Sequence, residues 1–162
     1  MYLIEGRKTA EEFIALAWSL EDGTAQFYAT VKDMLLDAAA KKVFDSLVRA
    51  EEMHKSNLLE AYRLIKGSNN WTEEARQGTL SGIMESGISV SEAIAWVKQP
   101  ERQPQDILEF SMQLETNSLD LYMKISRETE NEGMRKIFNM LIDEEKKHLL
   151  RLGNLLNSMY NV

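Results

Sequence analysis

Cysteine is absent from the 162 residues of this chain, which excludes disulfides, thiolate zinc sites, iron–sulfur clusters and cysteine nucleophiles. Basic residues are also few, with 19 Lys and Arg against 26 Asp and Glu and no basic stripe. This balance argues against a nucleic-acid partner and an anionic membrane surface. No stretch approaches the ~18 apolar residues of a membrane span. The N-terminal segment lacks the apolar run of a signal peptide, so we expect a cytoplasmic protein.

Proline is scarce, and the two prolines, Pro100 and Pro104, fall in one short stretch. Elsewhere apolar residues recur at three- and four-residue steps, which is the period of amphipathic helices. The capping-box spacing of TAEE (9–12) predicts a helix start, and Pro104 suits the first residue of a later helix. Residues 67–103 hold several glycines, so we expect a long crossover there, containing a short helix opened by SVSE (89–92). The long helices are predicted at about 9–35, 39–66, 104–128 and 132–159.

Two short turns and one long connection among four helices are typical of a bundle with a single crossover. We therefore predict an all-α fold in which two antiparallel helical hairpins pack together as one domain spanning residues 1–162. The sequence also repeats itself at an offset of 94 residues. Helical periodicity alone accounts for the matched leucines and phenylalanines, but not for matched charged residues on the apolar face. The identical pairs include Leu20/Leu114, Glu21/Glu115, Tyr28/Tyr122, Phe44/Phe138, Glu51/Glu145 and His54/His148.

Histidine occurs twice, and each histidine follows a glutamate by three residues, as Glu51–His54 and Glu145–His148. Residues at this spacing are neighbours on one helix surface. Each of these glutamates lies 30 residues after a partner, Glu21 or Glu115, and the midpoint of each interval falls at a predicted turn. Positions equidistant from a hairpin turn lie level with each other. Four carboxylates and two imidazoles should therefore meet at one height in the bundle.

This is the ligand set of a carboxylate-bridged dinuclear iron or manganese site, with one Glu from each of two helices and Glu-x-x-His from the other two. Two divalent cations would balance four carboxylates that are otherwise too costly to bury. The alternative is that these carboxylates are solvated on the outer face of the bundle. The position of Glu21, between Leu20 and Phe27 on the inward stripe, argues against that alternative.

Three further residues are candidates for supporting the ligands. Tyr28 and Tyr122 each follow a helix glutamate by seven residues, two turns along the same face. They could hydrogen-bond to bridging carboxylates, or they could be ordinary core tyrosines with satisfied hydroxyls. Glu144 could orient His54 or His148 by accepting its other ring proton.

Four segments carry a resemblance to the ferritin-like superfamily, within it the rubrerythrin and bacterioferritin branch. They are LEDGTAQFY (20–28), EEMH (51–54), LETNSLDLY (114–122) and EEKKH (144–148). The resemblance spans essentially the whole chain and implies a ferritin-like four-helix bundle with a dinuclear non-haem iron centre that reacts with hydrogen peroxide or dioxygen. It implies that Glu51 and Glu145 bridge the metals. It also implies terminal ligands at Glu21, Glu115, His54 and His148.

Two departures from rubrerythrins bear on the expected activity. The four-cysteine iron domain that passes electrons to the site is missing, and Ser118 stands where rubrerythrins carry an extra glutamate. We therefore expect a diiron oxidoreductase, with manganese able to replace iron, that needs a separate electron-donor protein. Two alternatives stay open: a ferroxidase serving iron storage or trafficking, and a metal-stabilised structural or interaction bundle without turnover. We expect a homodimer.

Overall fold

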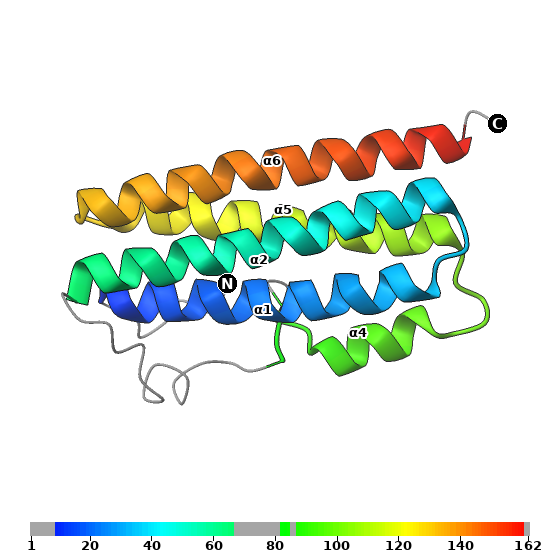
Figure 1. Cartoon of the computed structure of the whole chain (residues 1–162), viewed down its shortest axis with the longest axis horizontal. Helices are drawn as coiled ribbons and strands as arrows, with labels where there is room; N and C mark the ends of the chain where they lie inside the picture. The colour runs from blue at the N-terminus through cyan, green and yellow to red at the C-terminus, as the bar shows by residue number, and fades with distance from the viewer. Residues whose placement is uncertain (1–8, 67–81, 85–86, 161–162) are drawn as a thin grey trace.

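The computed structural model describes residues 9–66, 82–84 and 87–160, and these residues form an all-α bundle (Figure 1). The all-α prediction is thus confirmed. Each predicted long helix corresponds to an observed one, to within one residue at either end. No helix among the described residues is both long and apolar enough to cross a membrane. The helices are α1 (Ala10–Met34), α2 (Ala38–Lys66), α4 (Val90–Val97), α5 (Pro104–Glu128) and α6 (Glu132–Tyr160).

The starts of three helices follow from local sequence. Both expected capping boxes are present, Thr9 with Glu12 at the start of α1 and Ser89 with Glu92 at the start of α4. In each, the hydroxyl accepts from a backbone N–H that has no partner within the helix, while the glutamate accepts from the capping residue's own N–H. Pro104 begins α5, where its missing N–H costs no helical hydrogen bond.

The four long helices run side by side, with α1 packed along α2, α5 along α6, and α2 facing α6 (Figure 1). The short helix α4 packs against α1. The chain leading to it crosses α1 at Gly23, where a Cβ atom would lie 2.4 Å from the carbonyl oxygen of Ile83. Any larger residue at this position would push the connection away. Residues 67–81 and 85–86 of the expected crossover lie outside the described residues.

The apolar core is divided into two clusters. One contains Phe44 and Leu47 and lies nearer the α1–α2 turn, and the other contains Met134 and Phe138 and lies nearer the α5–α6 turn. Along each long helix, one or two charged or imidazole side chains separate the members of the two clusters. The interior therefore has a polar layer enclosed by apolar layers, and this layer is made of Glu21, Glu51, His54, Glu115, Glu145 and His148.

Candidate metal centre

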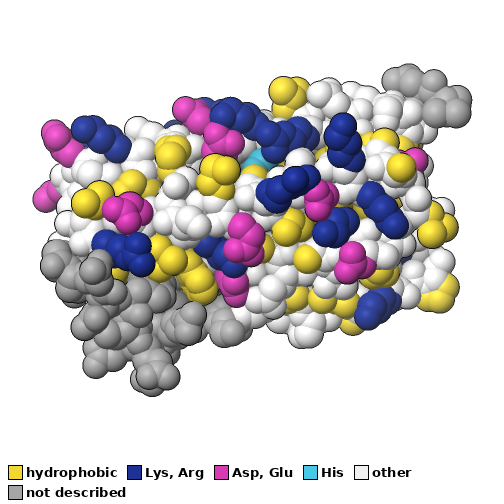
Figure 2. Space-filling view, viewed as in Figure 1, with side chains coloured by type: hydrophobic (Ala, Val, Ile, Leu, Met, Phe, Trp, Pro, Cys, Tyr) yellow, Lys and Arg dark blue, Asp and Glu magenta, His cyan; other side chains and the backbone are white. Residues whose placement is uncertain are grey.

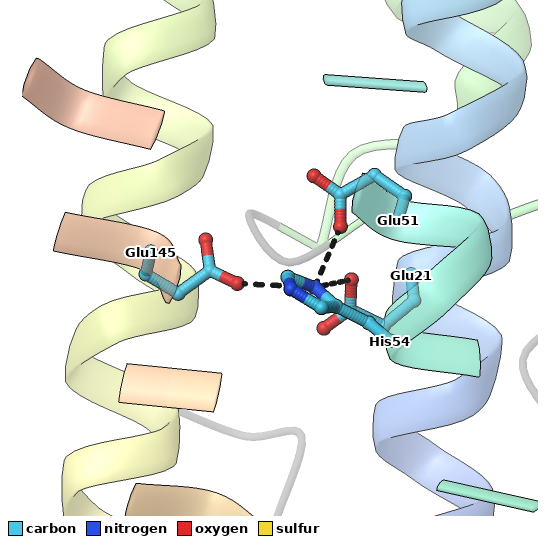
Figure 3. A group of neighbouring side chains, drawn as sticks. All are labelled: Glu21, Glu51, His54 and Glu145. Carbon is cyan, nitrogen blue, oxygen red and sulfur yellow. Dashed lines mark hydrogen bonds and ion pairs between the residues drawn. The ribbon is translucent and has the colours of Figure 1, made fainter. Parts of the chain in front are cut away.

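The four long helices bring all six expected ligand residues together, and none of the six is more than 2% exposed. Ligand atoms of Glu21, Glu51, His54 and Glu145 lie within 4.8 Å of one another, and those of Glu51, Glu115 and His148 do the same. Figure 3 shows the three carboxylates of the first group converging on the His54 ring. These two buried groups could hold metal ions.

Two of the glutamates reach both imidazoles. Glu51 places Oε2 at 3.1 Å from His54 Nδ1 and Oε1 at 3.3 Å from His148 Nδ1. Glu145 places Oε1 at 3.7 Å from His54 Nδ1 and Oε2 at 3.6 Å from His148 Nδ1. The two rings are stacked with centroids 5.3 Å apart. Each of these carboxylates therefore faces both halves of the cluster.

The other two glutamates are each in contact with one imidazole. Glu21 Oε2 lies 3.1 Å from His54 Nδ1, and Glu115 Oε2 lies 3.0 Å from His148 Nδ1. Each contact joins residues of one hairpin, because Glu21 and His54 come from α1 and α2 while Glu115 and His148 come from α5 and α6. The six residues thus divide into two shared carboxylates and two carboxylate–imidazole pairs.

The two tyrosines join the hairpins to each other. The Tyr28 hydroxyl donates to Glu115 and the Tyr122 hydroxyl donates to Glu21, so each reaches a carboxylate of the opposite hairpin. Neither of the two alternatives drawn from the sequence, hydrogen bonds to the carboxylates expected to bridge or ordinary core tyrosines, describes these partners. Instead, a residue two turns beyond its own helix's glutamate faces across the bundle and meets the glutamate of the other hairpin. The hydroxyls thereby fix the carboxylates that contact one imidazole only.

Glu144 and Ser118 take other partners. Glu144 Oε1 accepts from Lys147 Nζ at 2.5 Å, and no contact of the described residues joins it to a histidine ring. Glu144 is partly buried between α2 and α6, and Lys147, one turn away on α6, binds its carboxylate. The buried Ser118 hydroxyl donates to the Leu114 carbonyl of its own helix, so it adds no ligand atom.

Burial and mutual repulsion raise the pKa of two of the four carboxyls, and contacts with neighbouring groups lower the pKa of the other two. Burial and the charge of Glu51 raise the pKa of Glu21 from 4.5 to about 7. Burial and the charge of Glu115 raise the pKa of Glu145 well above 4.5. Burial opposes ionisation of Glu51 too, but hydrogen bonding to Glu21 and the charge of His148 lower its pKa to about 2. For Glu115 the charge of His148 likewise outweighs burial and lowers the pKa.

Both imidazoles are held in the protonated form. Burial lowers the pKa of His54, but the carboxylates of Glu21 and Glu51 outweigh it and raise that pKa to about 10. Burial is outweighed in the same way for His148, whose pKa is raised by Glu115 and Glu51. The metal-free cluster is therefore close to neutral, with two imidazolium ions facing two carboxylates. Two divalent ions with four carboxylates and two neutral imidazoles are neutral as well, so the donor set fits a pair of such ions.

This balance predicts that metal binding releases protons. At pH 7 we expect about three to four protons per chain, two from the imidazoles, one from Glu145 and part of one from Glu21. Because the Glu21 pKa is about 7, the number of protons released should fall by about one between pH 6 and pH 8. Calorimetric titration with Mn²⁺, in buffers of different ionisation enthalpy at these pH values, measures the number of protons released per chain. Release of less than one proton would show that the groups are ionised before metal binds.

A pocket of ≈ 320 Å³ between α2 and α6 reaches the cluster at His54. Figure 2 shows a histidine side chain among Lys and Arg side chains on this face. The sequence does not predict this pocket, because the pocket forms where a face of α2 meets a face of α6, and the spacing within either helix does not show which faces meet. The only available signal was the 94-residue repeat, in which small Ala50 matches Glu144. The lining residues are Ser46, Arg49, Ala50, Met53, His54, Asn57, Met140, Glu144 and Arg151.

No family model matches this sequence, and neither a curated protein nor a solved structure is similar enough to count as a match. Inference about function therefore rests on the residues of the cluster and of the pocket beside it.

Proposed function

We propose that this chain is a ferritin-like dinuclear iron oxidoreductase that reduces hydrogen peroxide or dioxygen with electrons from a separate donor protein. The observation that carries the proposal is the placement of Glu51 and Glu145, each with one oxygen toward each imidazole nitrogen. A carboxylate placed in this way suits a bridge between two metal ions. Each ion would also have one carboxylate–imidazole pair among its ligands, Glu21 with His54 for one and Glu115 with His148 for the other.

Iron suits both the donors and the chemistry. Carboxylate oxygen and imidazole nitrogen are ligands of iron(II) and manganese(II), and the chain offers no thiolate that would select softer ions. A bound iron pair would supply the electrons and the Lewis acidity for reduction of an oxidant. Manganese in one or both positions is compatible with the same ligands, so metal identity is part of the proposal.

The protein's own groups have definable tasks in such a site. The hydroxyls of Tyr28 and Tyr122 keep the carboxylates of Glu115 and Glu21 oriented. The apolar clusters on both sides restrict water, which strengthens each charge interaction within the layer. The carboxyls and imidazolium groups that hold extra protons in the metal-free state release them when metal binds. All four glutamates are then ionised and both imidazoles are neutral.

The pocket favours this proposal over the alternative of a ferroxidase for iron storage, in which many Fe²⁺ ions would have to reach the cluster. Arg49 and Arg151 line it, and their positive charges oppose the entry of Fe²⁺ while leaving uncharged peroxide and dioxygen unaffected. An oxidant could therefore approach the His54 side of the cluster along a route unfavourable for the metal itself.

The proposal is tested by mixing protein loaded anaerobically with two ferrous ions per chain with hydrogen peroxide in a stopped-flow spectrophotometer. Each peroxide accepts two electrons and two protons and yields two waters, so one peroxide should oxidise one iron pair. We expect near-ultraviolet absorbance of oxidised iron to rise faster than for aqueous ferrous ion at equal pH. The metal should stay bound, and added reductant should restore the ferrous state for further turnovers.

The alternatives predict different results in this experiment. Oxidation of many ferrous ions per chain, with release or mineral growth, would favour a ferroxidase. Loaded ferrous protein that reacts no faster than free iron would favour a metal-stabilised bundle without turnover. Either result would overturn the proposed oxidoreductase.

A further inference from the structure

The pocket between α2 and α6 opens toward one histidine only, although the two helices repeat each other. Ala50 lies one turn before His54, and its repeat counterpart Glu144 lies one turn before His148. Ala50 lines the pocket beside His54 with only a methyl group, whereas the corresponding position on α6 carries the longer side chain of Glu144. His54 therefore lines the pocket, and His148 does not.

The His54 ring presents a hydrogen-bond donor that has no acceptor. Its Nδ1 atom faces the carboxylates of Glu21 and Glu51, while its buried Nε2 atom has no hydrogen-bond partner. When Nδ1 binds a metal ion, the one proton of the neutral ring sits on Nε2, so the Nε2–H group is a hydrogen-bond donor. A buried donor favours occupation of the adjacent space by an acceptor.

The charges that face the pocket favour an anionic acceptor. Arg151 has no ion-pair or hydrogen-bond partner among the described parts of the chain, and Arg49 shares the Asp45 carboxylate with Lys32. The one acidic residue of the lining, Glu144, is neutralised by Lys147, which is bound to it at 2.5 Å. Asn57 and Ser46 add neutral polar groups to the walls. The pocket therefore carries excess positive charge beside a buried N–H donor.

We propose that this pocket binds one small oxyanion, a carboxylate or a tetrahedral anion, between the Arg151 guanidinium and the His54 Nε2–H group. Guanidinium groups match the oxygens of such anions, often through two parallel hydrogen bonds. The bound anion would accept the outer ring proton of His54, as outer carboxylates do for metal-bound histidines elsewhere. The inference goes beyond the proposed function because it requires no redox reaction.

Histidine NMR tests the proposal directly, because the chain has only two imidazoles. Protein labelled with ¹⁵N-histidine is loaded with redox-inert Zn²⁺ and titrated with sodium sulfate or sodium acetate. Sodium chloride keeps the ionic strength constant and serves as the reference. One Nε2–H signal should shift with a saturable dependence on the anion, and the other should stay in place. A lower midpoint for sulfate identifies a tetrahedral anion as the preferred class, and a lower midpoint for acetate identifies a carboxylate.

Two variants and a control assign the effect to the pocket. Arg151→Gln should raise the midpoint about 10- to 100-fold, since it removes a charged hydrogen bond. Ala50→Leu should abolish the saturable shift by filling the space beside His54. Arg63→Gln, an exposed arginine of α2 that pairs with Glu60 and lies outside the pocket lining, should leave the midpoint unchanged.

Three outcomes would overturn the anion site: no shift, shifts of both rings that grow linearly with salt, or an unchanged midpoint in Arg151→Gln. The same titration of the metal-free protein gives an independent result, because Arg151, which supplies the charge of the site, is not one of the candidate metal ligands. A chain that bound sulfate but no metal would retain the anion site and lose the proposed oxidoreductase.

Discussion

Replacing Glu51 with alanine is expected to reduce the metal content from two ions per chain to fewer than one. The Glu51 carboxylate has one oxygen near each imidazole, so its truncation removes a ligand from both metal positions together. Removing one partner of a buried charge cluster typically costs about 3–5 kcal/mol. If that cost falls on metal binding, the affinity is weaker by on the order of 10²–10⁴-fold. Elemental analysis after desalting, with calorimetric titration by Mn²⁺, measures both quantities.

The neighbouring residue provides a matched control. Glu52 is exposed on the same turn of α2 and pairs with Lys55 at the surface, so Glu52→Ala should keep two ions per chain. Far-ultraviolet circular dichroism of both variants establishes that the bundle has formed. If folded Glu51→Ala protein still bound two ions with unchanged affinity, Glu51 would not bridge them. Glu145→Ala gives the second test, because its carboxylate also faces both imidazoles.

Removing the metal should produce the second large effect, a drop in thermal stability. An ion that binds only the folded chain stabilises it by about 4 kcal/mol when its free concentration is about 1,000 times its Kd. Two such ions would contribute roughly 8 kcal/mol, and for a chain of this length each kcal/mol changes Tm by about 2–4 °C. We therefore expect a chelator to lower Tm by about 15–30 °C in calorimetric scans of protein that initially holds two ions.

The Glu51→Ala variant tests whether the chelator lowers Tm by removing metal from the cluster. Its Tm should be insensitive to chelator, whereas Glu52→Ala should respond as the unaltered chain does. A Tm that stayed constant while elemental analysis recorded the loss of both ions would show that the metals contribute nothing to folding. Such a result would leave their redox role intact but would exclude a structural one.

The positions of the helices and of the ligands could be predicted because both depend on spacing along the chain. The recurrence of apolar residues marked the helices, and the spacing between Glu21, Glu51 and His54 placed the three side chains at one height. The partners of Tyr28 and Tyr122 could not be predicted, since they depend on how one hairpin is rotated against the other. The pocket escaped prediction for a similar reason, because it depends on surface residues of two helices.

The state of the cluster without metal also depends on three-dimensional contacts. The sequence alone suggests that four buried carboxylates need two divalent cations to balance their charge. In the structure, His54 and His148 lie close enough to hold protons against the carboxylates, and Glu21 and Glu145 retain protons of their own. Protons can thus replace the cations in the polar layer, so the bundle can form before metal arrives.

The crossed tyrosine contacts bear on the ancestry of the chain. Each hairpin supplies three of the six residues of the cluster and the tyrosine that holds the other hairpin's glutamate, so neither hairpin forms the cluster alone. Two identical hairpins associated about an exact twofold axis would assemble the same cluster, as expected if the gene arose by duplication and fusion. Because the two halves of such a dimer are identical, a pocket beside one imidazole would have to be present beside the other as well. In a single chain the two halves can differ, and with Ala50 on α2 and Glu144 on α6 the pocket between these helices is lined by His54 and not by His148.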